Sequence, residues 1–75
     1  MTYGVLKMRI IKEWYGKSGL IARFYQLPEG YFLDYKGCHI TTRVFVCGTK
    51  VTCERDDVPN RYIDAIQNMA RKGIL

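Results

Sequence analysis

The stretch DVPNRYIDAIQNMARKG, residues 57–73, decides the fold because its periodicity predicts a single structure. Its apolar residues recur at the spacing of one helical face, and its polar residues take the opposite side. The predicted inner face consists of Val58, Tyr62, Ala65, Ile66, Met69 and Ala70. A helix with one apolar face needs a surface that covers it, so the rest of the chain is expected to supply that surface.

Both ends of this segment carry residues that helices use to begin and end. Asp56 or Asp57 is expected to accept hydrogen bonds from the first free amide groups of the helix. Gly73 suits the left-handed conformation that closes a helix. Residues 74–75 are then expected to fold back onto the last turn.

The chain before the helix alternates between apolar and polar side chains, which is typical of strands. The predicted strands are Tyr3–Trp14, Leu20–Gln26, Tyr31–Tyr35, His39–Val46 and Lys50–Glu54, with a turn at 15–19. For residues 3–14 a helix stays an alternative, because Leu6, Ile10 and Trp14 also share one helical face. We therefore predict one α+β domain over residues 1–75: an antiparallel sheet of four or five strands with the C-terminal helix on one face.

Length and composition limit the class of protein. With 75 residues, of which 48% are hydrophobic and 13% aromatic, the chain suits one small folded domain and not a disordered tail. The sequence shows no run typical of a membrane span or a signal peptide, so a soluble intracellular protein is expected. A formal charge of +5 and a pI near 9.3 favour an acidic partner.

Cysteine and histidine predict little chemistry. The three cysteines, Cys38, Cys47 and Cys53, form no recognisable disulfide framework and are expected to stay reduced. The paired half-sites of structural zinc modules are absent from the sequence, and neither a metal nor a cofactor is expected. His39 is the only histidine, and a lone histidine on a strand is more often a packing or surface residue than a catalytic one.

The sheet face that the helix leaves uncovered is the main functional clue. If the side with Leu6, Phe24, Val44 and Val51 meets the helix, cations and tyrosines share the other side. The predicted binding residues of that side are Lys7, Arg9, Arg23, Tyr25 and Arg43, with Tyr31 or Tyr35 nearby. A second basic patch is predicted on the outer helix face at Arg61, Arg71 and Lys72. Such a surface suits phosphate contacts with base stacking, or a protein interface, and an ordinary solvated sheet face is the alternative.

One resemblance covers residues 36–75. Lys36-Gly37-Cys38-His39, the strand after it, the return over residues 48–52 and Asp57-Val58-Pro59 before a helix resemble the order of elements in HicA-type toxins. These are small mRNA interferases that resemble double-stranded-RNA-binding domains. The family carries its catalytic histidine in a Gly-Ser-His pattern, so the resemblance implies a ribonuclease that uses His39, with Cys38 in place of the serine.

In size, predicted layout and lack of active-site motifs, the chain also resembles very small phage-encoded inhibitors, a class that includes anti-CRISPR proteins. The function we expect is therefore a non-enzymatic binding protein of phage or mobile-element type that inhibits a host nucleoprotein machine in the bacterial cytoplasm. Its expected partner is a host nucleoprotein complex or an acidic protein surface, with nucleic acid as a further option and no membrane. A HicA-like ribonuclease and a small sheet-based DNA-binding domain are the alternatives. The sequence leaves open whether two copies form a dimer.

Overall fold

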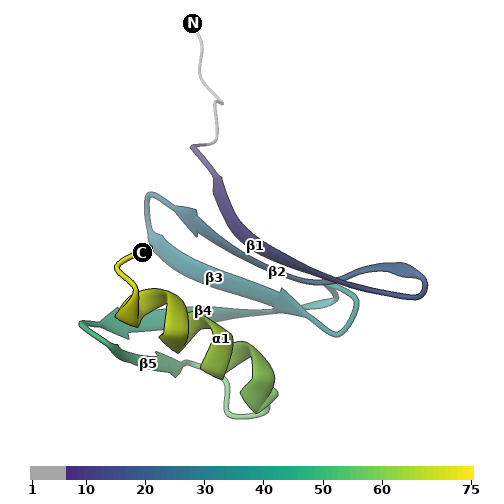
Figure 1. Ribbon diagram of the computed structural model, residues 1–75. Helices are drawn as coiled ribbons and strands as arrows, with labels where there is room; N and C mark the ends of the chain where they lie inside the picture. Colours follow the sequence, from purple (N-terminus) through teal and green to yellow (C-terminus); the bar gives the residue numbers. More distant parts are fainter. Residues whose placement is uncertain (1–6) are drawn as a thin grey trace, which may run out of the picture.

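The structure, a computed structural model, describes residues 7–75 and contains five strands followed by one helix (Figure 1). The elements are β1 (Arg9–Gly16), β2 (Gly19–Leu27), β3 (Gly30–Tyr35), β4 (Ile40–Cys47), β5 (Lys50–Cys53) and α1 (Asn60–Arg71). Each strand pairs antiparallel with the next one along the chain, so the sheet order is β1-β2-β3-β4-β5. The predicted α+β layout is confirmed, and β1 settles the choice between strand and helix from Arg9 onward.

Tight turns join the first three strands. The β1–β2 turn is shorter than predicted, because Gly16 and Gly19 pair with each other and only residues 17–18 lie between the strands. Gly19 has a φ of 117° and Gly30, after the next turn, a φ of 141°. Both values fall in the region that side chains disfavour, which explains why glycine stands at these two positions.

The helix packs on one face of the sheet, which we call the covered face. The core combines sheet residues of that face with the inner side of α1. Its buried members are Ala22, Phe24, Leu33, Tyr35, Val44, Val51, Val58, Tyr62 and Ile66. The predicted inward positions Phe24, Val44 and Val51 are confirmed, whereas Leu6 lies outside the described residues. Trp14 extends this core to β1, where its ring meets the ring of Tyr62 edge-on at 5.0 Å between centroids.

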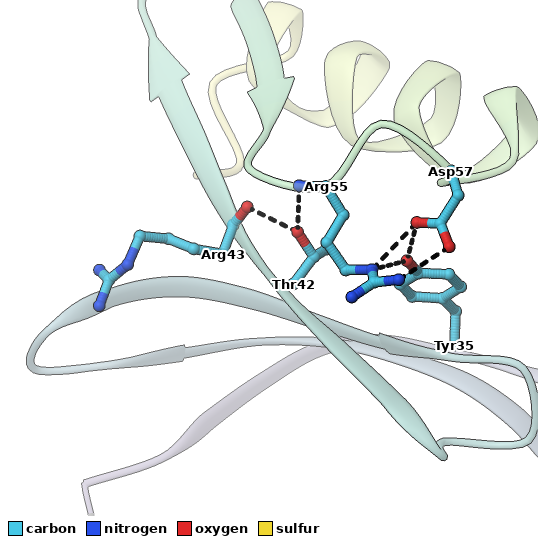
Figure 2. Close-up of polar contacts among 5 residues, drawn as sticks. All are labelled: Tyr35, Thr42, Arg43, Arg55 and Asp57. Carbon is cyan, nitrogen blue, oxygen red and sulfur yellow. Dashed lines mark hydrogen bonds and ion pairs between the residues drawn. The ribbon is translucent and has the colours of Figure 1, made fainter.

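The start of the helix differs from the prediction. Pro59 occupies the N-cap position, and no side chain caps the first amide groups of α1. Asp57 instead accepts a 2.6 Å hydrogen bond from the hydroxyl of Tyr35, a fully buried residue of β3 (Figure 2). The prediction of an aspartate cap was wrong because the carboxylate of Asp57 accepts hydrogen bonds from Tyr35 and Arg55 instead of the first helical amides.

Arg55 completes this connection between the sheet and the chain that leads into α1. Its guanidinium donates to both carboxylate oxygens of Asp57 at 3.0 and 3.1 Å, and to the Tyr35 hydroxyl at 3.0 Å (Figure 2). The backbone amide of Arg55 donates to Oγ1 of Thr42 on β4. The hydrogen bonds from Arg55 and then from Tyr35 hold the pKa of Asp57 well below its usual range. These contacts, which we call the Arg55 clip, tie the connection between β5 and α1 to strands β3 and β4.

The end of the helix agrees with the prediction. Gly73 has a φ of 72°, and the amide of Ile74 donates to the carbonyl of Met69 at 3.0 Å. This pattern closes the last turn and turns the chain back. Leu75 packs against the core, whereas Ile74 remains 49% exposed.

An irregularity in β1 changes which side its residues face. The register with β2 shifts between Ile10 and Lys12, so Ile10 stands opposite Tyr25 and Lys12 opposite Phe24. A bulge inserts one residue and reverses the alternation beyond it. Ile10 and Trp14, which regular alternation predicts on one side, therefore lie on opposite faces of the sheet.

Candidate binding surface

The face that α1 leaves uncovered is built from two rows of side chains that run across the strands. We call it the open face. One row, the aromatic row, follows the register Ile10–Tyr25–Phe32–Arg43. The other, the polar row, follows Glu13–Arg23–Asp34–Thr41. Residues opposite each other on neighbouring strands point to the same side of a sheet, so each row is a line of side chains on adjacent strands.

The aromatic row is stacked and largely immobilised by its own contacts. The rings of Tyr25 and Phe32 stack with centroids 5.9 Å apart and planes 23° apart. The guanidinium of Arg43 lies 4.8 Å from the Phe32 centroid, and it also donates to the carbonyl of Glu29 at 3.0 Å. Tyr25 is only 8% exposed although no helix covers it. Cation–π and stacking contacts therefore hold the groups of this row against one another before any partner binds.

Exposed apolar side chains lie at the margins of the aromatic row. Ile10 ends the aromatic row on β1 and is 49% exposed. Phe45 lies two residues beyond Arg43 on β4, on the same face, and is 47% exposed. Large apolar groups that remain half in water are the residues that gain most from covering by a partner.

Within the polar row, each carboxylate is matched to donors. Glu13 accepts from Nε of Arg23 at 2.9 Å and from the hydroxyl of Tyr15 at 2.6 Å. Asp34 accepts from Tyr25 at 3.0 Å and from Thr41 at 2.7 Å. The hydrogen bonds from Tyr15 and then Arg23 lower the pKa of Glu13.

The same pairing decides the charge of the open face. This face carries two arginines, Arg23 and Arg43, and two carboxylates, Glu13 and Asp34, which both lie in the polar row. Arg23 is ion-paired with Glu13, whereas Arg43 donates to the backbone carbonyl of Glu29. Desolvation, followed by the bond to Asp34, raises the pKa of Tyr25 to about 12, so its hydroxyl stays a neutral donor. The open face is therefore close to neutral, and the expectation of a cationic sheet surface is wrong for this part of the molecule.

The predicted sheet residues do not all come together. Arg23, Tyr25 and Arg43 share the open face. Arg9 instead bonds to Oε1 of Gln26, at 3.1 Å from Nε and 2.8 Å from the terminal nitrogen, and Gln26 belongs to the covered face by alternation with Phe24. The prediction for Arg9 is wrong because the bulge reverses the alternation of β1. Lys7 precedes β1 and lies beside Arg9, next to Leu27 and Pro28.

Two tyrosines expected near the open face lie on the other side. Tyr31 stacks on Phe24 at 5.6 Å, and Tyr35 is part of the core. Phe32 takes their place in the aromatic row, and the sequence reasoning missed it. A usable signal was Leu33, which has no polar atom and fixes the inward side of β3, so that Phe32 and Asp34 must face outward.

The predicted helix patch is divided between the two ends of α1. Arg61 lies over the ring of Tyr62 at 4.7 Å and donates to its hydroxyl, whereas Arg71 bonds to Asn68 in the last turn. Arg61 and Arg71 are separated by about 15 Å of helix. Lys72 follows the helix and is exposed. The structure therefore places Arg71 and Lys72 together and Arg61 apart from them.

The chemistry that the sequence considered for His39 can also be located. His39 is exposed and lies just before β4, and the thiol of Cys38 beside it has its pKa raised by burial and then by Asp34. Asp34 is itself engaged by Tyr25 and Thr41. Among residues 7–75 no three histidine, cysteine or acidic side chains gather as a metal site would require. Within these same residues no side-chain hydrogen bond joins His39 to a carboxylate, and the raised pKa of Cys38 favours its neutral thiol.

Comparison of the chain with protein-family models, with curated proteins and with solved structures finds no match. In the described part of the chain, no helix has the length and apolarity needed to cross a membrane. Fold and surface together define the class: a small α+β domain with one sheet face covered by a helix and the other open, neutral and aromatic.

Proposed function

We propose that this chain is a non-enzymatic binding protein whose open face docks on a partner protein. The biological setting we propose is inhibition of a host nucleoprotein machine in the bacterial cytoplasm by a phage or mobile-element protein of anti-CRISPR type. The observation that carries the binding proposal is the stacked row Tyr25–Phe32–Arg43 between exposed Ile10 and Phe45. Aromatic and arginine side chains that are ordered before binding lose little freedom when a partner covers them.

The charge distribution supports a protein contact at this face. Nucleic acid is bound mainly through cations that neutralise phosphates. On the open face Arg23 is paired with Glu13, and Arg43 lies over Phe32 and donates to the carbonyl of Glu29. The net charge of +5 therefore comes from other parts of the surface. That charge favours the encounter with an acidic nucleoprotein, while the open face supplies the specific contact.

The test is a pull-down from bacterial lysate with the tagged chain, with and without nuclease, followed by identification of protein and nucleic acid in the eluate. We expect one defined host complex that persists after nuclease treatment. The variant Ile10→Ser/Phe45→Ser should lose the complex, because both apolar contacts lie on the open face. Recovery of nucleic acid alone, removed by nuclease, would overturn the proposal and direct the work to His39 and RNA cleavage.

Met8→Ser is the control, since Met8 is 40% exposed but precedes β1 and belongs to neither row of the open face. Capture of the complex should be retained with this variant. Equal loss with both variants would show that exposed apolar area in general, and not the open face, holds the partner. Charge reversal at Arg23 is a less clean test, because it places a second carboxylate beside Glu13 and disturbs the polar row itself.

A further inference from the structure

A second surface lies where α1 meets β1, and it is a groove with an apolar floor and a cationic rim. The groove has a volume of about 390 Å³. Its floor is formed by Ile11, Met69 and Ile74, together with Ala65, and its rim by Lys12, Asn68 and Lys72. We call it the β1–α1 groove.

Two departures from regular structure create the groove. The bulge in β1 places both Ile11 and Lys12 on the helix side, where regular alternation would send one of them to the open face. At the other wall, the left-handed Gly73 returns the chain, so that Ile74 lies beside Met69. An apolar floor and two lysines thus come together from segments about sixty residues apart in the sequence.

The rim carries positive charge without internal compensation. The ion pairs within residues 7–75 are Arg23–Glu13 and Arg55–Asp57, so neither Lys12 nor Lys72 is engaged in one. No carboxylate is among the described residues that line the groove. Arg71, the neighbour of Lys72, adds a further cation at this end of the helix.

We propose that the β1–α1 groove binds an acidic peptide segment of a partner protein. One apolar side chain of the segment lies on the floor between Ile11, Met69 and Ile74, and carboxylates beside it meet Lys12 and Lys72. Charge complementarity selects the acidic flanks, and the flexible, polarizable Met69 adapts to the shape of the apolar side chain.

The floor favours a peptide over a nucleic acid backbone. A phosphodiester chain would satisfy the two lysines but leave the apolar floor uncovered, whereas a peptide satisfies both. The two register shifts in β1 also interrupt its free edge, at Ile10–Lys12 and at Trp14–Tyr15. The segment is therefore held by side chains in the groove and not by strand addition to the sheet.

The experiment is an amide NMR titration of the isotope-labelled full chain with a short peptide that has one leucine between glutamates and aspartates. Amide shifts are expected at Lys12, Asn68, Lys72 and Ile74. Two control peptides are used, one with serine in place of leucine and one with lysines in place of the acids. Each should bind at least about tenfold more weakly than the acidic peptide. Shifts confined to the open face would overturn the proposal, and so would stronger binding of a short RNA duplex at the same amides.

Paired charge variants locate the site. Lys12→Glu/Lys72→Glu should lower the affinity for the acidic peptide about tenfold or more, because two attractive charge pairs become repulsive. Lys17→Glu/Lys50→Glu makes the same change of net charge at two exposed positions, one in the β1–β2 turn and one at the start of β5, and should retain most of the affinity. Equal weakening by both variants would overturn the proposal, since net charge alone would then explain binding. Ile10→Ser/Phe45→Ser should bind the peptide normally, which separates this groove from the open face.

Discussion

The two faces of the sheet are held by different forces. On the covered face, Phe24, Leu33 and Tyr35 are fully buried under α1, and burial of apolar surface holds them in place. On the open face, the corresponding neighbours Tyr25, Phe32 and Asp34 are ordered by contacts along the sheet: a stacked ring pair, a cation over a ring and shared hydrogen bonds. The first face requires the helix, whereas the second is complete without it.

This difference predicts that substitutions on the two faces will affect the free energy of unfolding unequally. Side chains of the covered face contribute mainly to the free energy of unfolding, because their removal leaves a cavity. Side chains at the margin of the open face are about half exposed, so their replacement is expected to have little effect on folding. The comparison can be tested with pairs of variants, one on each face.

The largest expected effect is on the covered face. Leu33→Ala should lower the free energy of unfolding by about 2 to 5 kcal/mol, because it opens a cavity in the core. Ile10→Ala removes a side chain of the same size from the open face and should cost less than about 1 kcal/mol. Urea denaturation followed by far-UV circular dichroism measures both. Similar losses would show that the open face is also part of the folding core.

The two tyrosines that donate to aspartates form the second pair. Tyr35→Phe removes a hydroxyl with two charged partners, at 2.6 Å to Asp57 and 3.0 Å to Arg55, and should cost about 2 kcal/mol. Tyr25→Phe removes a single 3.0 Å bond to Asp34 and should cost about 1 kcal/mol. Urea denaturation measures both losses. A larger loss for Tyr25→Phe than for Tyr35→Phe would mean that the Arg55 clip contributes less to the free energy of unfolding than the polar row.

The smallest expected effect is a change in how the free energy of unfolding depends on pH. The pKa of Asp57 is lowered in the folded chain by Arg55 and then Tyr35, so its contribution is complete above the ordinary carboxyl pKa, at about pH 4. That contribution is lost as the pH falls further toward the lowered pKa. Asp57→Asn should therefore reduce the loss of stability between pH 4 and pH 2.5, measured by urea denaturation at each pH.

Asp56→Asn is the control for this experiment, since Asp56 is the adjacent carboxylate and takes no part in the ion pairs of residues 7–75. It should keep the pH dependence of the original chain. If Asp56→Asn and Asp57→Asn reduced it equally, the general negative charge of this connection, and not the clip, would explain acid sensitivity.

Much of the fold follows from local pattern, and the candidate site follows only in part. Arg23, Tyr25 and Arg43 were found on the right face because β2 and β4 alternate without interruption. Arg9 was misplaced and Lys12 was missed, both because of the bulge in β1. A bulge depends on how one strand meets its neighbour, and that contact is not visible in the sequence of a single strand.

The sequence by itself determined the strand runs, the turns between them, the helix with its apolar side, and the glycine that ends it. These features depend on local periodicity and backbone conformation, which a short stretch of residues specifies. The tertiary structure alone decided that Arg23 pairs with Glu13, that Asp57 joins the Arg55 clip instead of capping α1, and that Lys12 and Lys72 line the same groove. Each of these outcomes depends on which side chains lie opposite one another across strands or between sheet and helix, so each needed the complete register and packing.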